Sequence, residues 1–167
     1  FRFAYKAIYG NRPLFVTAVK DCRIVYIGTK SYDVAHVDES IDLAVLGKGR
    51  DFRNLNCRSV DKNEQVVLTG YPEGSTQSLI SPGITRKDRK SKYAAVEGFA
   101  MKGMSGGPVV QDNGQLSGVF KSYRGTSRYW YVPGPKICKS LKRLNGAVFN
   151  DAPAYKKAPE VPKVQVA

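Results

Sequence analysis

A series of short apolar segments, each of strand length and separated by turn-forming residues, limits this chain to an all-β fold. Turns such as Asp112-Asn113-Gly114-Gln115 lie between them, because glycine and asparagine accept a positive φ. Regular short strands of this kind predict a sandwich or a pair of barrels. The expected strands are Arg2–Ile8, Pro13–Val19, Arg23–Ile27, Asp33–Val37, Leu43–Leu46, Gln65–Gly70, Ser78–Ile84, Tyr93–Phe99, Pro108–Gln111, Gln115–Lys121 and Arg128–Val132.

One helix is expected near the C-terminus. Pro135 suits a first helical turn, Ile137, Leu141 and Leu144 share a face at helical spacing, and Gly146 is expected to end the helix. From Asp151 onward the composition changes to alanine, proline, lysine and valine, which is typical of an extended tail or linker.

The 167 residues amount to one domain or two small lobes. The sequence shows no signal peptide at Phe1 and no apolar run near the roughly 20 residues of a membrane span. The three cysteines, Cys22, Cys57 and Cys138, lack CxxC spacing. We therefore expect neither a disulfide framework nor a zinc site, and a reducing compartment follows as the simpler interpretation.

Positive charge is concentrated in the second half of the chain. The net charge is +13, of which residues 1–83 contribute +2 (11 Lys/Arg, 9 Asp/Glu) and residues 84–167 contribute +11 (16 and 5). Such a field attracts RNA or an acidic membrane surface, although a solvated face that aids solubility is the alternative. One segment alone supplies five of these cations: Arg86, Lys87, Arg89, Lys90 and Lys92.

The sharpest motif is Gly103-Met104-Ser105-Gly106-Gly107-Pro108-Val109-Val110. A nucleophilic serine needs a tight turn that exposes its hydroxyl and directs backbone N–H groups at the developing oxyanion. Glycines around Ser105 permit that turn, and the alternative is an ordinary glycine-rich turn between strands.

This motif closely resembles the nucleophile region of chymotrypsin-like serine proteases. The segment Val37–Leu46 resembles the strand and turn that present the catalytic aspartate, here Asp42, and residues 66–74 and 81–84 resemble the opening strands of the second barrel. The compact loops resemble those of bacterial stress proteases and, more closely, those of polyprotein-processing proteases of positive-strand RNA viruses such as sobemoviruses and astroviruses. The resemblance implies two antiparallel β-barrels, with residues 1–62 and 63–150 as the lobes and 151–167 as the tail.

The same resemblance implies a role for each site residue. Ser105 is the expected nucleophile, Asp42 orients the base, and the N–H groups of Gly103 and Ser105 form the oxyanion hole. Lys121, Ser122 and Tyr123 pair with the substrate backbone as an added strand. Ala100 and Phe120 are expected to wall the primary specificity pocket. They offer a carboxylate no partner, so we expect an apolar or small P1 residue rather than glutamate.

The general base is missing from the expected position. The one histidine, His36, lies only six residues before Asp42. Lys20, in Phe15-Val16-Thr17-Ala18-Val19-Lys20-Asp21-Cys22, or Lys6 stands where the family has histidine. Three explanations stay open beside His36: residues that bear the histidine are missing near the start of the chain, the fold is inactive, or a lysine of depressed pKa acts as the base.

These observations predict a serine endopeptidase that processes a viral polyprotein in the host cytoplasm, either alone or as part of a larger membrane-anchored polyprotein. The alternative is an inactive protease fold that binds RNA or a protein. Aromatic residues such as Tyr123 and Trp130 could then stack bases. No cofactor and no metal is expected.

Overall fold

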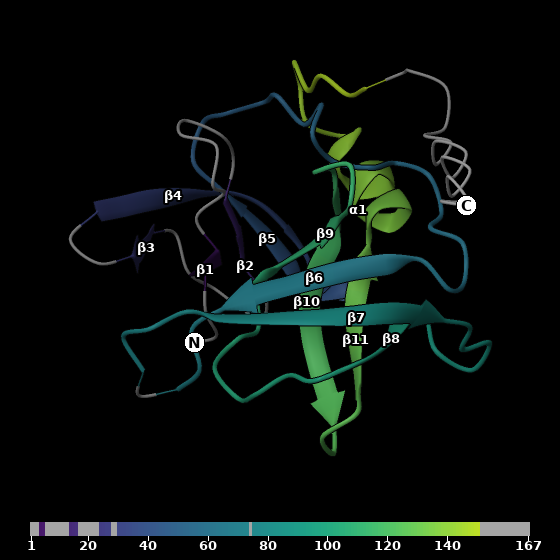
Figure 1. Cartoon of the computed structure of the whole chain (residues 1–167). Helices are drawn as coiled ribbons and strands as arrows, with labels where there is room; N and C mark the ends of the chain where they lie inside the picture. Colours follow the sequence, from purple (N-terminus) through teal and green to yellow (C-terminus); the bar gives the residue numbers. More distant parts are fainter. Residues whose placement is uncertain (1–3, 6–13, 17–23, 28–29, 74, 151–167) are drawn as a thin grey trace, which may run out of the picture.

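The computed structural model describes residues 4–5, 14–16, 24–27, 30–73 and 75–150, and nearly all of their regular structure is β-strand (Figure 1). Each of the eleven expected segments overlaps one strand, which confirms that prediction. The strands are β1 (Ala4–Tyr5), β2 (Leu14–Val16), β3 (Ile24–Ile27), β4 (Lys30–Asp38), β5 (Leu43–Leu46), β6 (Gln65–Gly70), β7 (Leu79–Arg86), β8 (Ala94–Gly98), β9 (Pro108–Gln111), β10 (Leu116–Arg124) and β11 (Arg128–Pro133). Of these, β4, β7, β10 and β11 extend beyond the expected bounds.

Strands β6 to β11 form a closed antiparallel barrel in the order β10-β11-β8-β7-β6-β9. Burial alternates along β6, so that Val66 and Leu68 face the interior. The barrel core also contains the side chains of Val96, Ala100, Met104, Val109, Phe120, Tyr129 and Tyr131. Each strand of the barrel has a partner on both sides, although β10 extends past the end of its pairing with β9 at Val119.

Strands β1 to β5 form an open sheet in the order β1-β2-β5-β4-β3. The prediction of two closed barrels is therefore wrong for this half of the described residues. The sheet repeats the barrel's order, β7-β8-β11-β10-β9, without a counterpart of β6, the strand that closes the barrel between β7 and β9. In the part of the chain that the structure describes, no strand joins β1 to β3.

Helix α1 (Gly134–Leu141) packs where the two halves meet. Its buried Ile137 and Leu141 belong to one core cluster with Ile41 and Val45 of the sheet half and Val132 of the barrel. The helix is shorter than expected, because the chain turns after Leu141: the Leu144 N–H donates to the Leu141 carbonyl at 2.9 Å. The two halves therefore share an apolar interface at this cluster, which we call the joint.

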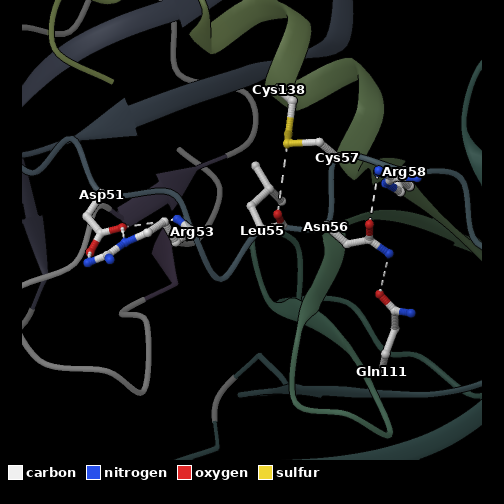
Figure 2. Close-up of a disulfide and its surroundings, with 8 residues drawn as sticks. All are labelled: Asp51, Arg53, Leu55, Asn56, Cys57, Arg58, Gln111 and Cys138. Atoms are coloured by element: carbon white, nitrogen blue, oxygen red, sulfur yellow. Dashed lines mark hydrogen bonds and ion pairs between the residues drawn. A yellow bond between two sulfur atoms is a disulfide. The ribbon is translucent and has the colours of Figure 1, made fainter. Parts of the chain in front are cut away.

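A disulfide joins Cys57, in the segment between the two halves, to Cys138 on helix α1 (Figure 2). Beside it, Asn56 donates from its side-chain amide to Gln111 at 2.7 Å, which holds the linking segment against the barrel. The expectation of unpaired cysteines is wrong for these two residues. They are 81 positions apart in sequence, so spacing alone could not pair them. The disulfide also removes the observation on which a reducing compartment was predicted.

Candidate active site

Ser105 lies in a tight loop that leads into β9. The Gly106 N–H donates to the Phe120 carbonyl at 2.9 Å and the Phe120 N–H donates to the Gly107 carbonyl at 2.8 Å, which joins the loop to β10. Gly103 has φ +98°, and a Cβ built there would lie 2.4 Å from the backbone nitrogen of Glu73. Both the backbone conformation and the available space therefore require glycine at position 103.

The polar groups of this loop are arranged around Ser105. Its Oγ donates to the Lys121 carbonyl at 3.1 Å. The N–H groups of Gly103 and Ser105 have no acceptor in the described part of the chain, although the neighbouring N–H groups of Met104, Gly106 and Gly107 are paired. Two unpaired N–H groups beside a serine hydroxyl are the donors that an oxyanion hole requires.

Asp42 reaches the same region from the other half of the molecule. It follows the 3₁₀ turn Glu39–Ile41 and adopts a left-handed conformation (φ 52°, ψ 52°), which aspartate tolerates better than most residues. The Lys121 Nζ contacts the Asp42 carboxylate. The Lys92 Nζ also donates to the Ser40 carbonyl at 2.8 Å, so two lysines of the barrel half hold this turn.

Comparisons with known proteins identify the family. A profile described as "Trypsin-like peptidase domain" matches residues 9–119, well over half of the chain. The chain belongs to the trypsin-like peptidase domain family. A search of curated protein sequences finds no match.

Solved structures agree with this fold. The active form of the Rv3671c protease from M. tuberculosis is similar with a TM-score of 0.62 and 21% identity, over 81% of this chain and 70% of that one. The serine endoprotease from Yersinia pestis is similar with a TM-score of 0.63 and 19% identity, over 80% of this chain and 54% of that one. At such identities the likeness extends to the fold alone, which is that of a serine protease.

His36 contacts a serine other than Ser105. It lies on β4, and its Nε2 is 2.8 Å from the Ser140 Oγ on α1, at the joint between the two halves. Among the described residues, no imidazole contacts Ser105 or Asp42. The other candidate bases, Lys6 and Lys20, lie outside the described residues.

Among the described residues, it is the Lys121 ammonium that contacts the Asp42 carboxylate. Lys121 uses two groups at once, because its carbonyl accepts from Ser105 while its Nζ pairs with Asp42. Sequence reasoning assigned Lys121 to substrate pairing and missed this ion pair. No local pattern could have revealed it, since the two residues are 79 positions apart.

The residues expected to wall a specificity pocket are packed into the barrel core. Ala100 and Phe120 are 3% and 1% exposed. The Phe120 ring packs edge-on against Tyr129, with 5.6 Å between ring centroids. Tyr129 is fully buried, its hydroxyl has no hydrogen-bond partner in the described part of the chain, and burial raises the pKa of this phenol.

The segment of β10 that is expected to pair with substrate, Lys121–Tyr123, has an edge that does not pair with β9. Residues Leu116–Val119 of β10 pair with β9, but this pairing ends before Lys121, and the register with β11 shifts between Phe120 and Ser122. Ser122 and Tyr123 are exposed. An unpaired edge next to Ser105 can accept an extended peptide as an added strand.

The described residues contain no group of three or more histidine, cysteine, aspartate or glutamate side chains placed to hold a metal ion. Among the same residues, no helix has the length and apolar character needed to cross a membrane. The site is thus described by its serine, its carboxylate, its lysine and its backbone donors.

Proposed function

We propose that this chain is a serine endopeptidase in which Ser105 is the nucleophile. The observation that carries the proposal is the Ser105 loop, with its hydroxyl and the N–H groups of Gly103 and Ser105, for which no acceptor lies in the described part of the chain. The Ser105 Oγ would attack the scissile carbonyl carbon and give its proton to a base. The two N–H groups would stabilise the resulting oxyanion. The base would then pass its proton to the amine as the C–N bond breaks, and water would hydrolyse the acyl-serine to restore Ser105.

The role of Asp42 in this reaction is to orient and charge-stabilise the base. In the described residues the partner of Asp42 is the Lys121 ammonium, which has no lone pair while it is protonated. The proposal therefore takes the base from a residue outside the described ranges. Because Val16 at the end of β2 pairs with Ala44, two residues after Asp42, Lys20 is a stronger candidate position than Lys6.

The substrate we propose is an extended polypeptide bound along Lys121, Ser122 and Tyr123. A small P1 residue suits this site best, because Ala100, Phe120 and Tyr129 fill the space in which a large P1 side chain would lie. The compact loops, and the alanine- and proline-rich residues 151–167, support a peptidase that acts within a viral polyprotein in the host cell.

Cleavage of a library of extended peptides by the whole chain tests this function. We expect hydrolysis after alanine, glycine or serine, and no hydrolysis by the Ser105→Ala variant. A profile dominated by glutamate at P1 would refute the pocket argument alone. Cleavage that survives in Ser105→Ala would refute the nucleophile. To test polyprotein processing, the chain is expressed with a fluorescent protein after Ala167, and release of that protein within residues 151–167 is expected.

An inactive protease fold that binds a partner is the second candidate. The Lys121–Asp42 pair favours it, because a protonated lysine in contact with the carboxylate neutralises the group that a histidine base would need. This candidate would be supported over the first if the Ser105→Ala variant and the wild type bound extended peptides with equal affinity and neither protein hydrolysed them.

A further inference from the structure

A cavity lies at the opposite end of the barrel from Ser105. Strand β6 runs between the two sites. Its last residue, Gly70, packs against Met104 in the Ser105 loop, and its first residues lie beside Thr85, whose N–H donates to the Glu64 carbonyl at 2.9 Å. Six residues of strand span about 20 Å, so the two sites are separate.

The cavity has a volume of about 500 Å³ and an inner wall of buried residues, Thr85, Ala95 and Tyr131. Its rim is charged, with three cations (Lys62, Arg86 and Lys87) and one carboxylate (Asp61), so the lining carries a net positive charge. The remaining lining residues are Ser59, Val60, Asn63 and Ala94.

The three cations differ in their partners. Arg86 is held in place, because its guanidinium pairs with Glu97 at 2.8 Å and donates to Asn63 at 2.6 Å. Lys62 and Lys87 are exposed and have no carboxylate within ion-pair distance in the described part of the chain. Their two ammonium groups are therefore available to an anionic ligand.

Tyr131 lines the inner wall of the cavity and also belongs to the barrel core. The side chain is 2% exposed, and none of the hydrogen bonds among the described residues uses its hydroxyl. The neighbouring Thr85 hydroxyl is already occupied, since it donates to the Asp61 carbonyl at 2.6 Å and accepts from the Glu64 N–H at 2.9 Å. Burial raises the pKa of Tyr131 to about 12, so at neutral pH its hydroxyl can donate to an anion.

We propose that this cavity binds the phosphate of a nucleotide, with Lys62 and Lys87 as the charged contacts and Tyr131 as the inner donor. Two ammonium groups complement the two charges of a phosphate dianion better than they complement the single charge of a carboxylate ligand. The volume exceeds that of a phosphate and lies within the range of small-ligand sites, which leaves room for a nucleoside against Ala94 and Ala95.

The nucleotide could be free or part of an RNA strand, and the surrounding surface bears on this choice. The exposed Arg89 and Lys90 continue the positive charge beyond the cavity, and neither has an ion-pair partner among the described residues. Arg86 and Lys92, also expected to contact RNA, are engaged with Glu97 and Ser40. RNA would therefore contact the cavity and Lys87–Lys90 rather than the whole basic segment.

Titrations of the whole chain followed by backbone amide NMR test the proposal. The probes are uridine 5′-monophosphate, inorganic phosphate, uridine and hexauridylate. We expect uridine 5′-monophosphate to shift amides at 59–63 and 85–87, inorganic phosphate to bind there more weakly, and uridine to cause no shift. The Lys62→Gln/Lys87→Gln variant should weaken binding at least tenfold and Tyr131→Phe about fivefold.

The matched control is Lys48→Gln/Lys139→Gln, which removes the same charge from two other exposed lysines. An equal loss in this control, or binding of uridine as tight as that of its monophosphate, would overturn the proposal. Hexauridylate that binds more than tenfold tighter, and loses this advantage in Arg89→Gln/Lys90→Gln, would identify RNA as the source. Equal affinities would identify the mononucleotide. Binding by Ser105→Ala should equal wild type, so this test is independent of the proposed peptidase.

Discussion

The two halves of this chain follow one strand order but reach different degrees of closure. The barrel of β6 to β11 is complete, and its interior is filled by buried side chains. Among the described residues, the sheet of β1 to β5 repeats five strands of that order and has edges at β1 and at β3. One half is thus stabilised within itself, whereas the other depends on contacts with its neighbour.

This difference separates the two sides of the candidate active site. The Ser105 loop is held by hydrogen bonds to Phe120 on β10, inside its own half. The turn that carries Asp42 is held from across the joint, by Lys121, by Lys92 and by the apolar cluster around α1. We therefore expect the Ser105 loop to be preorganised within its own half. The position of the Asp42 carboxylate should instead depend on the contacts between the two halves.

The largest effect is expected from removing the disulfide at the joint. The Cys57→Ser/Cys138→Ser variant should lose about 4 kcal/mol of unfolding free energy, because the crosslink closes a long loop in the unfolded chain. Denaturant unfolding measures this loss. Reducing agent should destabilise the wild type by a similar amount and leave the variant unchanged, and equal stabilities without reductant would show that the bond does not form.

The next effect concerns the glycine of the Ser105 loop. Gly103→Ala should lose roughly 3 kcal/mol of unfolding free energy, because it adds a clash with Glu73 to the strain of a positive φ. The control is Gly114→Ala, which has φ +82° but nothing within 4 Å of the added Cβ, and should lose only about 1 kcal/mol. Equal losses would mean that the loop is not tightly packed.

A histidine at position 20 tests whether the half with the open sheet supplies the general base. Because Val16 pairs with Ala44 beside Asp42, Lys20→His should raise peptide hydrolysis by about 100-fold, the usual contribution of a positioned general base. Lys6→His is the matched control, since Lys6 follows β1, which β2 separates from β5. A gain in Lys6→His alone would reverse the assignment, and no gain in either would remove both.

The smallest effect is expected from Asp38, at the same joint. Hydrogen bonds from the Ser40 and Ser140 hydroxyls lower the pKa of this carboxyl. The carboxylate thus stabilises the fold above the ordinary aspartate pKa, and this contribution is lost as the pH falls through the lowered value. Asp38→Asn should cost less than about 1 kcal/mol at pH 7 and nothing near pH 2. Asp112→Asn, at an exposed turn, is the control, and an equal cost at both pH values would contradict this account.

Local patterns predicted the strands well, because turn residues such as Asn113-Gly114 and apolar spacing act over a few positions. The same patterns placed Ser105 in its loop through the glycines around it. Long-range pairings could not be predicted this way: Cys57 with Cys138, and Lys121 with Asp42, depend on how distant strands meet. The prediction of a closed first barrel failed, among the described residues, for a related reason. Closure depends on all strands of a lobe together and not on any local pattern.

Labelling with a fluorophosphonate probe tests the central claim most directly, because such probes react with a serine only when it is activated. The whole chain is incubated with the probe, and the adduct is mapped by mass spectrometry beside the Ser105→Ala variant. The account predicts an adduct on Ser105 in the wild type and none in the variant. An unlabelled wild type, under conditions in which an active serine protease is fully labelled, would contradict it and favour the inactive, binding fold.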